Sequence, residues 1–164
     1  MRPEFPSDAH QFHPLRIACA LNSGRLAPLV PCEFARALRR KTFTSKKADC
    51  AVVERLYATA FASRLGEATG LVFQGLGWDD AQAAQFAKVI ASGVLVRARV
   101  ISLAKNAIGS FGMQKLGAVI THRALPVIEQ FIVDDNPGDP TPVLRALTRG
   151  TGTGRPMGPA ASQV

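Results

Sequence analysis

Few residues in this chain have the types and the spacing that catalysis or metal binding requires. His10 and His13 form a His-x-x-His pair, and His122 stands apart from them. A zinc site takes three or four nitrogen or sulfur ligands at regular spacing, and no further ligands follow this pair at a useful distance. We therefore expect no bound metal, and nothing in the sequence predicts a cofactor.

Gly75 and Gly77 follow an apolar run, as the first glycines of a dinucleotide-binding loop do. Asp80 stands in the place of the third glycine, where its carboxylate would repel a pyrophosphate. The chain also lacks the Gly-x-x-x-x-Gly-Lys phosphate loop, the Gly-x-Ser-x-Gly turn and the His-Glu-x-x-His helix. The sequence predicts a protein that is not an enzyme, with an intrinsic activity as the alternative.

Two pairs of neighbouring carboxylates, Asp79 with Asp80 and Asp134 with Asp135, have the composition of an acid–base site. Neighbouring acids in a turn are usually solvated or cap the following helix. A helix-like run from Ala81 to Ile90 begins directly after the first pair. Capping of that helix is therefore the role that we predict for Asp79 and Asp80.

The positive charge is spread along the chain except for one cluster. The net charge is +8, with 11 basic and 6 acidic residues up to residue 70 and 9 basic and 6 acidic residues after it. The cluster within residues 36–47 consists of Arg36, Arg39, Arg40, Lys41, Lys46 and Lys47. It suits the solvated end of a helix, a contact with an acidic protein, or a nucleic-acid contact or nuclear import signal. Only Phe43 interleaves the cluster, so we expect nucleic-acid binding least.

The composition is that of an ordinary globular domain. Hydrophobic residues make up 47% and charged residues 20% of the 164 residues, enough for one domain with its own core. No apolar stretch approaches the roughly 18 to 20 residues of a membrane span. Residues 1–14 lack the apolar core of a signal peptide, and three cysteines without a close pair suit reduced thiols. We expect an intracellular protein, cytoplasmic or nuclear, with no membrane partner.

A pattern of apolar residues, asparagine and glycine recurs at a constant interval along the second half of the chain. The clearest unit contains Ile101, Leu103, Asn106, Ile108 and Gly109. The next unit contains Phe131, Val133, Asn136 and Gly138. The preceding unit has leucine in place of asparagine and contains Leu71, Phe73, Leu76 and Trp78. A weaker copy further upstream contains Cys19, Leu21, Leu26, Val30 and Phe34.

This order resembles the leucine-rich repeat of the ribonuclease-inhibitor-like family, most closely from Ile101 to Gly109. The resemblance implies an α/β fold, a short solenoid with parallel strands on one face and helices on the other. Its four strands are expected near Cys19, Leu71, Ile101 and Phe131. Asn106 and Asn136 would turn inward and bond backbone groups of the bend. The alternative is an unrelated mixed α/β domain in which short strands and helices alternate.

The predicted repeat domain spans residues 15–149 and contains one helix that does not belong to the repeat. This extra N-terminal amphipathic helix is expected at about residues 46–66, where apolar residues recur every four positions at Val53, Tyr57, Phe61 and Leu65. We expect it to cover the N-terminal end of the stack. Residues 1–14 are expected to be irregular, and residues 150–164 to form a disordered tail.

The predicted function is that of a protein–protein interaction module or small scaffold acting through the concave strand face. The residues expected to bind the partner are Arg99, Ser102, Lys105, Glu129, Gln130 and Asp134. Polar side chains of both signs suit a specific protein contact. The resemblance also implies an alternative, a regulator of an enzyme or small GTPase, because some repeat proteins of this kind act so. Nucleic-acid binding through residues 36–47 ranks third.

Overall fold

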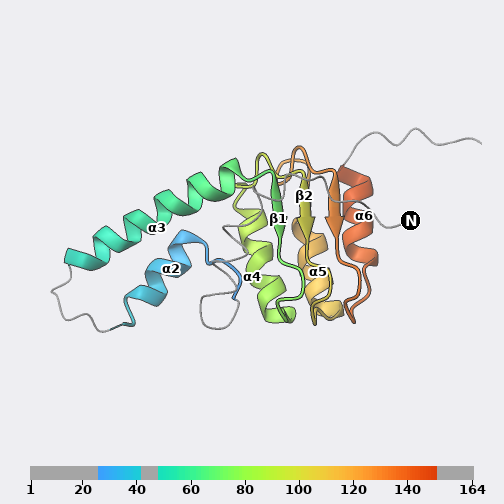
Figure 1. The fold of residues 1–164 in the computed structure, drawn as a ribbon, viewed down its shortest axis with the longest axis horizontal. Coiled ribbons are helices and arrows are strands. Elements are labelled where there is room, and N and C mark those ends of the chain that lie inside the picture. The colour runs from blue at the N-terminus through green and yellow to red at the C-terminus, as the bar shows by residue number, and fades with distance from the viewer. Residues whose placement is uncertain (1–25, 42–47, 151–164) are drawn as a thin grey trace, which may run out of the picture.

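The computed structural model describes residues 26–41 and 48–150, which form five helices and three strands (Figure 1). Their order is α2 (Pro31–Leu38), α3 (Ala48–Glu67), β1 (Gly70–Val72), α4 (Asp80–Ala91), β2 (Val100–Ser102), α5 (Ser110–Val119), β3 (Gln130–Ile132) and α6 (Thr141–Gly150). The mixed helix and strand composition expected from the sequence is confirmed. The expected irregular segment 1–14 lies outside the described residues, and so does the expected tail beyond Gly150.

The three strands form one parallel sheet in the order β1-β2-β3. Leu71 pairs with Ile101, and Ile101 pairs with Phe131, so the pairing follows the interval of the sequence pattern without a shift. The strands expected at these three positions, and their parallel pairing, are confirmed. The fourth expected strand, near Cys19, lies outside the described residues.

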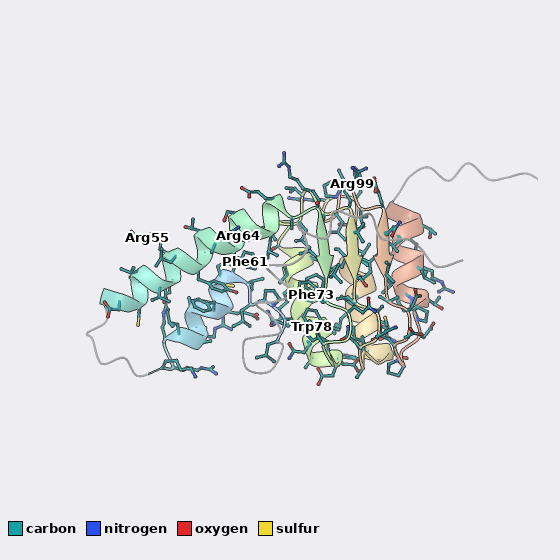
Figure 2. All side chains as sticks on the ribbon, viewed as in Figure 1. Arg55, Phe61, Arg64, Phe73, Trp78 and Arg99 are labelled. Atoms are coloured by element: carbon teal, nitrogen blue, oxygen red, sulfur yellow. The ribbon has the colours of Figure 1, made fainter. Side chains whose placement is uncertain are left out.

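The core lies between the sheet and helices α4, α5 and α6, which stand in a row on one side of it (Figure 1). Alternate strand residues turn toward these helices and are buried, namely Leu71, Phe73, Ile101, Leu103, Phe131 and Val133. Within the first of these units the ring of Phe73 stacks on that of Trp78, with centroids 4.7 Å apart (Figure 2). The apolar alternation in the sequence therefore marks the core side of each strand.

The extra helix of the sequence analysis is α3, and its packing differs from the expected one. Phe61 and Leu65 are buried near its C-terminal end, but Val52 and Leu56 are 45% and 62% exposed. Figure 1 shows α3 extending away from the sheet, with α2 beside it. The expectation that this helix covers the end of the stack is therefore correct only for its last turns.

Helix α2 explains this arrangement, because it packs against the inner side of α3. The rings of Phe34 and Tyr57 stack with their centroids 3.7 Å apart. The hydroxyl of Tyr57 donates a hydrogen bond to the carbonyl oxygen of Leu29 at 2.7 Å. Helix α2 is itself joined to α4 by an ion pair between Glu33 and Lys88. The middle of α3 is thus held by α2.

Candidate partner-binding surface

Asn106 joins two neighbouring units through its side-chain amide. Its Oδ1 accepts hydrogen bonds from the backbone N–H groups of Leu76 and Trp78, at 2.9 and 3.1 Å. Its Nδ2 donates to the carbonyl oxygens of Phe73 at 2.9 Å and Leu103 at 2.8 Å. The amide is buried and all its polar atoms are bonded, so the predicted inward position of this asparagine is confirmed.

Asn136 makes the equivalent contacts in the next unit. Its Oδ1 accepts from the N–H of Ile108 at 3.1 Å, and its Nδ2 donates to the carbonyl oxygens of Leu103 and Val133 at 2.9 and 2.8 Å. The bends that precede α4 and α5 are therefore each fixed by an asparagine of the following unit.

Asp79 caps α4, as predicted, but the same prediction is wrong for Asp80, which caps α5 instead. Asp79 Oδ1 accepts from the N–H groups of Ala81 and Gln82 at the start of α4, at 3.0 and 3.1 Å. Asp80 Oδ1 accepts from the N–H of Gly109 at 2.6 Å and that of Gly112 at 3.0 Å, at the start of α5. The contact between Asp80 and the start of α5 joins two units. No pattern in the sequence around Asp80 indicates it.

Two of the predicted partner-binding residues lie together where the strands begin. Arg99 precedes β2 and Glu129 precedes β3, and Arg99 Nε donates a hydrogen bond to Glu129 Oε1 at 2.9 Å. Both side chains are more than half exposed. The carboxylate of Glu129 raises the pKa of Arg99 above its ordinary value. Gln130, the first residue of β3, is also exposed beside this pair.

Two further predicted residues, Lys105 and Asp134, lie at the opposite ends of the strands. The backbone N–H of Lys105 donates to the carbonyl oxygen of Asp134 at 2.9 Å, and both side chains are exposed. Lys105 has φ of 55°, and Gly75 and Asp135, at the same place in the units before and after, have φ of 66° and 56°. Six residues of extended chain span about 20 Å, so Lys105 and Asp134 do not share one small contact area with Arg99 and Glu129.

Ser102 is not available to a partner, and the expectation that it is exposed is wrong. It is 0% exposed, in the middle of the sheet face that points away from the helices. Val72 and Ile132 lie at the same level on the two neighbouring strands, and branched side chains on both sides enclose the small serine. Its hydroxyl has no hydrogen-bond partner among the described residues.

The loops that lead into the strands carry exposed residues that the sequence analysis did not select. Val96 and Val127 are 50% and 46% exposed, and Arg97 and Arg123 are exposed as well. We call this surface the strand-start edge, and it consists of Val96, Arg97, Arg99, Arg123, Val127 and Glu129. Arg97 and Val127 take the same place, three residues before their strands, in two units whose strands pair side by side. The available signal was the run of Val96, Arg97 and Arg99 directly before β2.

The opposite edge of the sheet, where the chain turns into the helices, carries carboxylates. Asp79, Asp134, Asp135 and Asp139 are all exposed there. Asp139 Oδ1 accepts from the N–H of Thr141 at 2.9 Å, and hydrogen bonds from Thr141 lower the pKa of Asp139. Asp79 stands at the start of α4 and Asp139 stands just before α6. A carboxylate in such a place stabilises the positive end of the helix dipole, which explains why these two positions carry acids.

The basic cluster begins at the C-terminal end of α2, as one of its three interpretations expects. Arg36 lies in the last turn of α2, and Arg39 is the residue that ends it. Arg39 also forms an exposed ion pair with Glu54 of α3 at 3.4 Å. Lys46 and Lys47 lie outside the described residues.

Within residues 26–41 and 48–150, no three histidine, cysteine, aspartate or glutamate side chains lie close enough to hold a metal ion. In the same ranges, none of the helices is both long enough and apolar enough to span a membrane. The chain matches no family model, and no curated protein or solved structure matches it either.

Proposed function

We propose that the chain is a short leucine-rich-repeat solenoid of the ribonuclease-inhibitor-like kind that serves as a protein–protein interaction module. Two observations support the solenoid: strand pairing at the interval of the sequence pattern, and the equivalent backbone contacts made by Asn106 and Asn136. A single unit of this kind cannot bury its apolar side, and stacking supplies the missing cover.

The strand-start edge is the surface that we assign to the partner. The observation that carries this assignment is the exposure of Val96 and Val127, half in solvent, among the arginines of the same edge. Arginine is enriched and lysine is depleted at protein interfaces, and a partner that covers this edge would also bury the two valines. The sequence predicted a contact over the whole concave face of the strands. Because Ser102 is buried in the middle of that face, we assign to the partner only the edge where the strands begin.

A protein partner fits this edge better than a nucleic acid does. Glu129 lies within the edge and binds Arg99, and a carboxylate there would repel phosphates. None of the residues that define the edge is aromatic, so no base could stack on it. In this proposal the protein has no catalytic activity of its own.

Quantitative capture from extracts of the native cell tests the proposal. Arg97→Glu, Arg99→Glu and Arg123→Glu combined should reduce capture of the specific partner by roughly tenfold or more, because like charges would then face the partner's surface. Lys105→Glu, Lys115→Glu and Arg145→Glu combined change the net charge equally and lie outside the edge, so they should leave capture intact. Equal loss in both variants, or in neither, would refute the assignment of this edge.

Regulation of an enzyme or small GTPase is a second candidate for the same edge. Arg97 and Arg123 are exposed and form no ion pair with any described residue. A GTPase activator needs such an arginine to neutralise charge on the transferred phosphate. Arg97→Ala or Arg123→Ala should then abolish acceleration of the captured partner's GTP hydrolysis while binding persists.

A further inference from the structure

Helix α2 lies beside α3, away from the sheet (Figure 1), and none of its residues is buried. By contrast, five residues of α4 and three residues of α5 are buried. Ordering a segment costs conformational entropy, which the burial of apolar side chains normally offsets. A helix that buries no side chain is therefore held weakly, and such regions open at a low free energy.

The chain is anchored to α4 just before α2 begins. Ala27 is 4% exposed within the core, and its N–H donates a hydrogen bond to Oε1 of Gln82 at 2.7 Å. Nε2 of Gln85 donates to the carbonyl oxygen of Pro28 at 3.3 Å. Val30 packs against the core, and its extended backbone joins the anchored residues to α2. Rotation at Val30 can thus move α2 while the anchored residues stay in place.

Beyond this anchor, two ion pairs at the surface hold α2. Glu33 pairs with Lys88 of α4, and Arg39 pairs with Glu54 of α3. The side chains of Lys88 and Arg39 are 53% and 73% exposed. Ion pairs that are this open to water contribute little to stability, so these two contacts can break without loss of the core.

The apolar contact of α2 is the stack of Phe34 on the ring of Tyr57. The hydroxyl of Tyr57 donates its hydrogen bond to Leu29, which belongs to the anchored residues and not to α2. Movement of α2 would therefore uncover one face of the Tyr57 ring and keep this hydrogen bond. Tyr57 is the one tyrosine of the chain, so a tyrosine-specific reagent reports on this face alone.

We propose that α2 is a hinged strap, which opens at Val30 while the sheet and helices α4 to α6 stay folded. The two ion pairs and the aromatic stack hold the closed form, and opening uncovers the ring of Tyr57. The strap contains no residue of the strand-start edge, so this inference does not depend on the function proposed for that edge.

Hydrogen exchange of the full chain, followed by mass spectrometry in increasing urea, tests the strap. Amides of α2 should exchange faster than those of α4 and α5, with a weaker dependence on urea, because local opening exposes little surface. Ile101→Val shortens a buried side chain and destabilises the core. It should speed exchange in α5 and leave exchange in α2 unchanged, since α2 opens without the core.

Loss of both ion pairs should favour the open form. Glu33→Gln with Glu54→Gln should speed exchange in α2 roughly threefold or more. Iodination of the Tyr57 ring, located by mass spectrometry, should be faster in the same variant. Asp134→Asn with Asp135→Asn changes the net charge equally at a distance from α2, so it should alter neither rate.

Two results would overturn the inference. If Ile101→Val speeds exchange in α2 as much as in α5, α2 opens only when the whole protein unfolds. If amides of α2 in the wild type exchange as fast as those of an unstructured peptide, α2 is not attached at all. Partner capture by the strand-start variant has no bearing on either result, so the two proposals fail separately.

Discussion

The carboxylate of Asp80 accepts a hydrogen bond from the backbone N–H of Gly109 at 2.6 Å, which ties the start of α4 to the start of α5. The same oxygen accepts from Gly112, and a Cβ added at Gly112 would lie only 2.7 Å from it. Glycine at this position thus lets the two helix starts approach each other. One side chain caps a helix that begins a full unit further along the chain.

Replacement of Asp80 should therefore destabilise more than one helix start. Asp80→Ala should cost about 1 to 3 kcal/mol, because two N–H groups lose their acceptor in a partly buried place. Asp80→Asn should cost less, since its amide oxygen can still accept. Chemical denaturation measures both changes, and Asp79→Ala, which removes an exposed cap, should cost about 1 kcal/mol. An Asp80→Ala variant as stable as the wild type would contradict the bridging role.

Asn106→Ala should destabilise the protein by about 1 to 3 kcal/mol, because backbone groups of two units lose their partners in a buried site. Asn136→Ala should cost less, since Asn136 is more exposed and its amide accepts one backbone hydrogen bond where that of Asn106 accepts two. Urea unfolding of the two variants side by side gives the comparison. The reverse order of stabilities would contradict the hydrogen-bond pattern.

Replacement of Ser102 and replacement of its neighbour Leu103 should change the free energy of unfolding by different amounts. Leu103→Ala should cost about 2 to 5 kcal/mol, as is usual for an emptied leucine site in a core. Ser102→Ala should be nearly neutral, because the hydroxyl that it removes is buried without a partner among the described residues. Thermal unfolding of the two variants measures the difference.

Ser102→Glu provides the sharper test of the same burial. A carboxylate enclosed between Val72 and Ile132 would lose its hydration, so this variant should unfold at a clearly lower temperature than Gln130→Glu. Gln130 is exposed and serves as the matched control. Equal unfolding temperatures would show that Ser102 is open to solvent after all.

The ion pair between α2 and α4 should make stability depend on pH. Hydrogen bonds from Lys88 and Gln85 lower the pKa of Glu33 below its ordinary value of 4.5. A lowered pKa in the folded state means that the stabilisation is present above pH 4.5 and is lost as the pH falls through the folded value.

The wild type should therefore exceed Glu33→Gln in free energy of unfolding by up to about 1 kcal/mol at pH 7, and this margin should shrink on acidification below pH 4.5. Unfolding curves of both proteins across this range measure the margin. A margin that stays constant on acidification well below pH 4.5 would assign the stabilisation to packing of the side chain instead of its charge.

The sequence by itself determined the elements that depend on local periodicity. The spacing of Ile101 and Leu103, repeated in the following unit, was sufficient to predict where the strands lie and which of their side chains face the core. The parallel pairing and the inward asparagines were implied by the resemblance to a repeat family. The run of apolar residues at every fourth position predicted α3 to within two residues of its observed bounds. The strand positions, the core-facing residues and the helix bounds follow from the geometry of a single strand or helix, which is the same wherever the element occurs.

Only the tertiary structure decided which surfaces are open. Ser102 alternates correctly with its buried neighbours, yet it is enclosed because valine and isoleucine stand beside it on other strands. Val52 and Leu56 of α3 are exposed because α2 covers the opposite face of that helix, and Asp80 finds its partners one unit away. Exposure and pairing depend on residues distant in the chain, and periodicity along one segment carries no information about them.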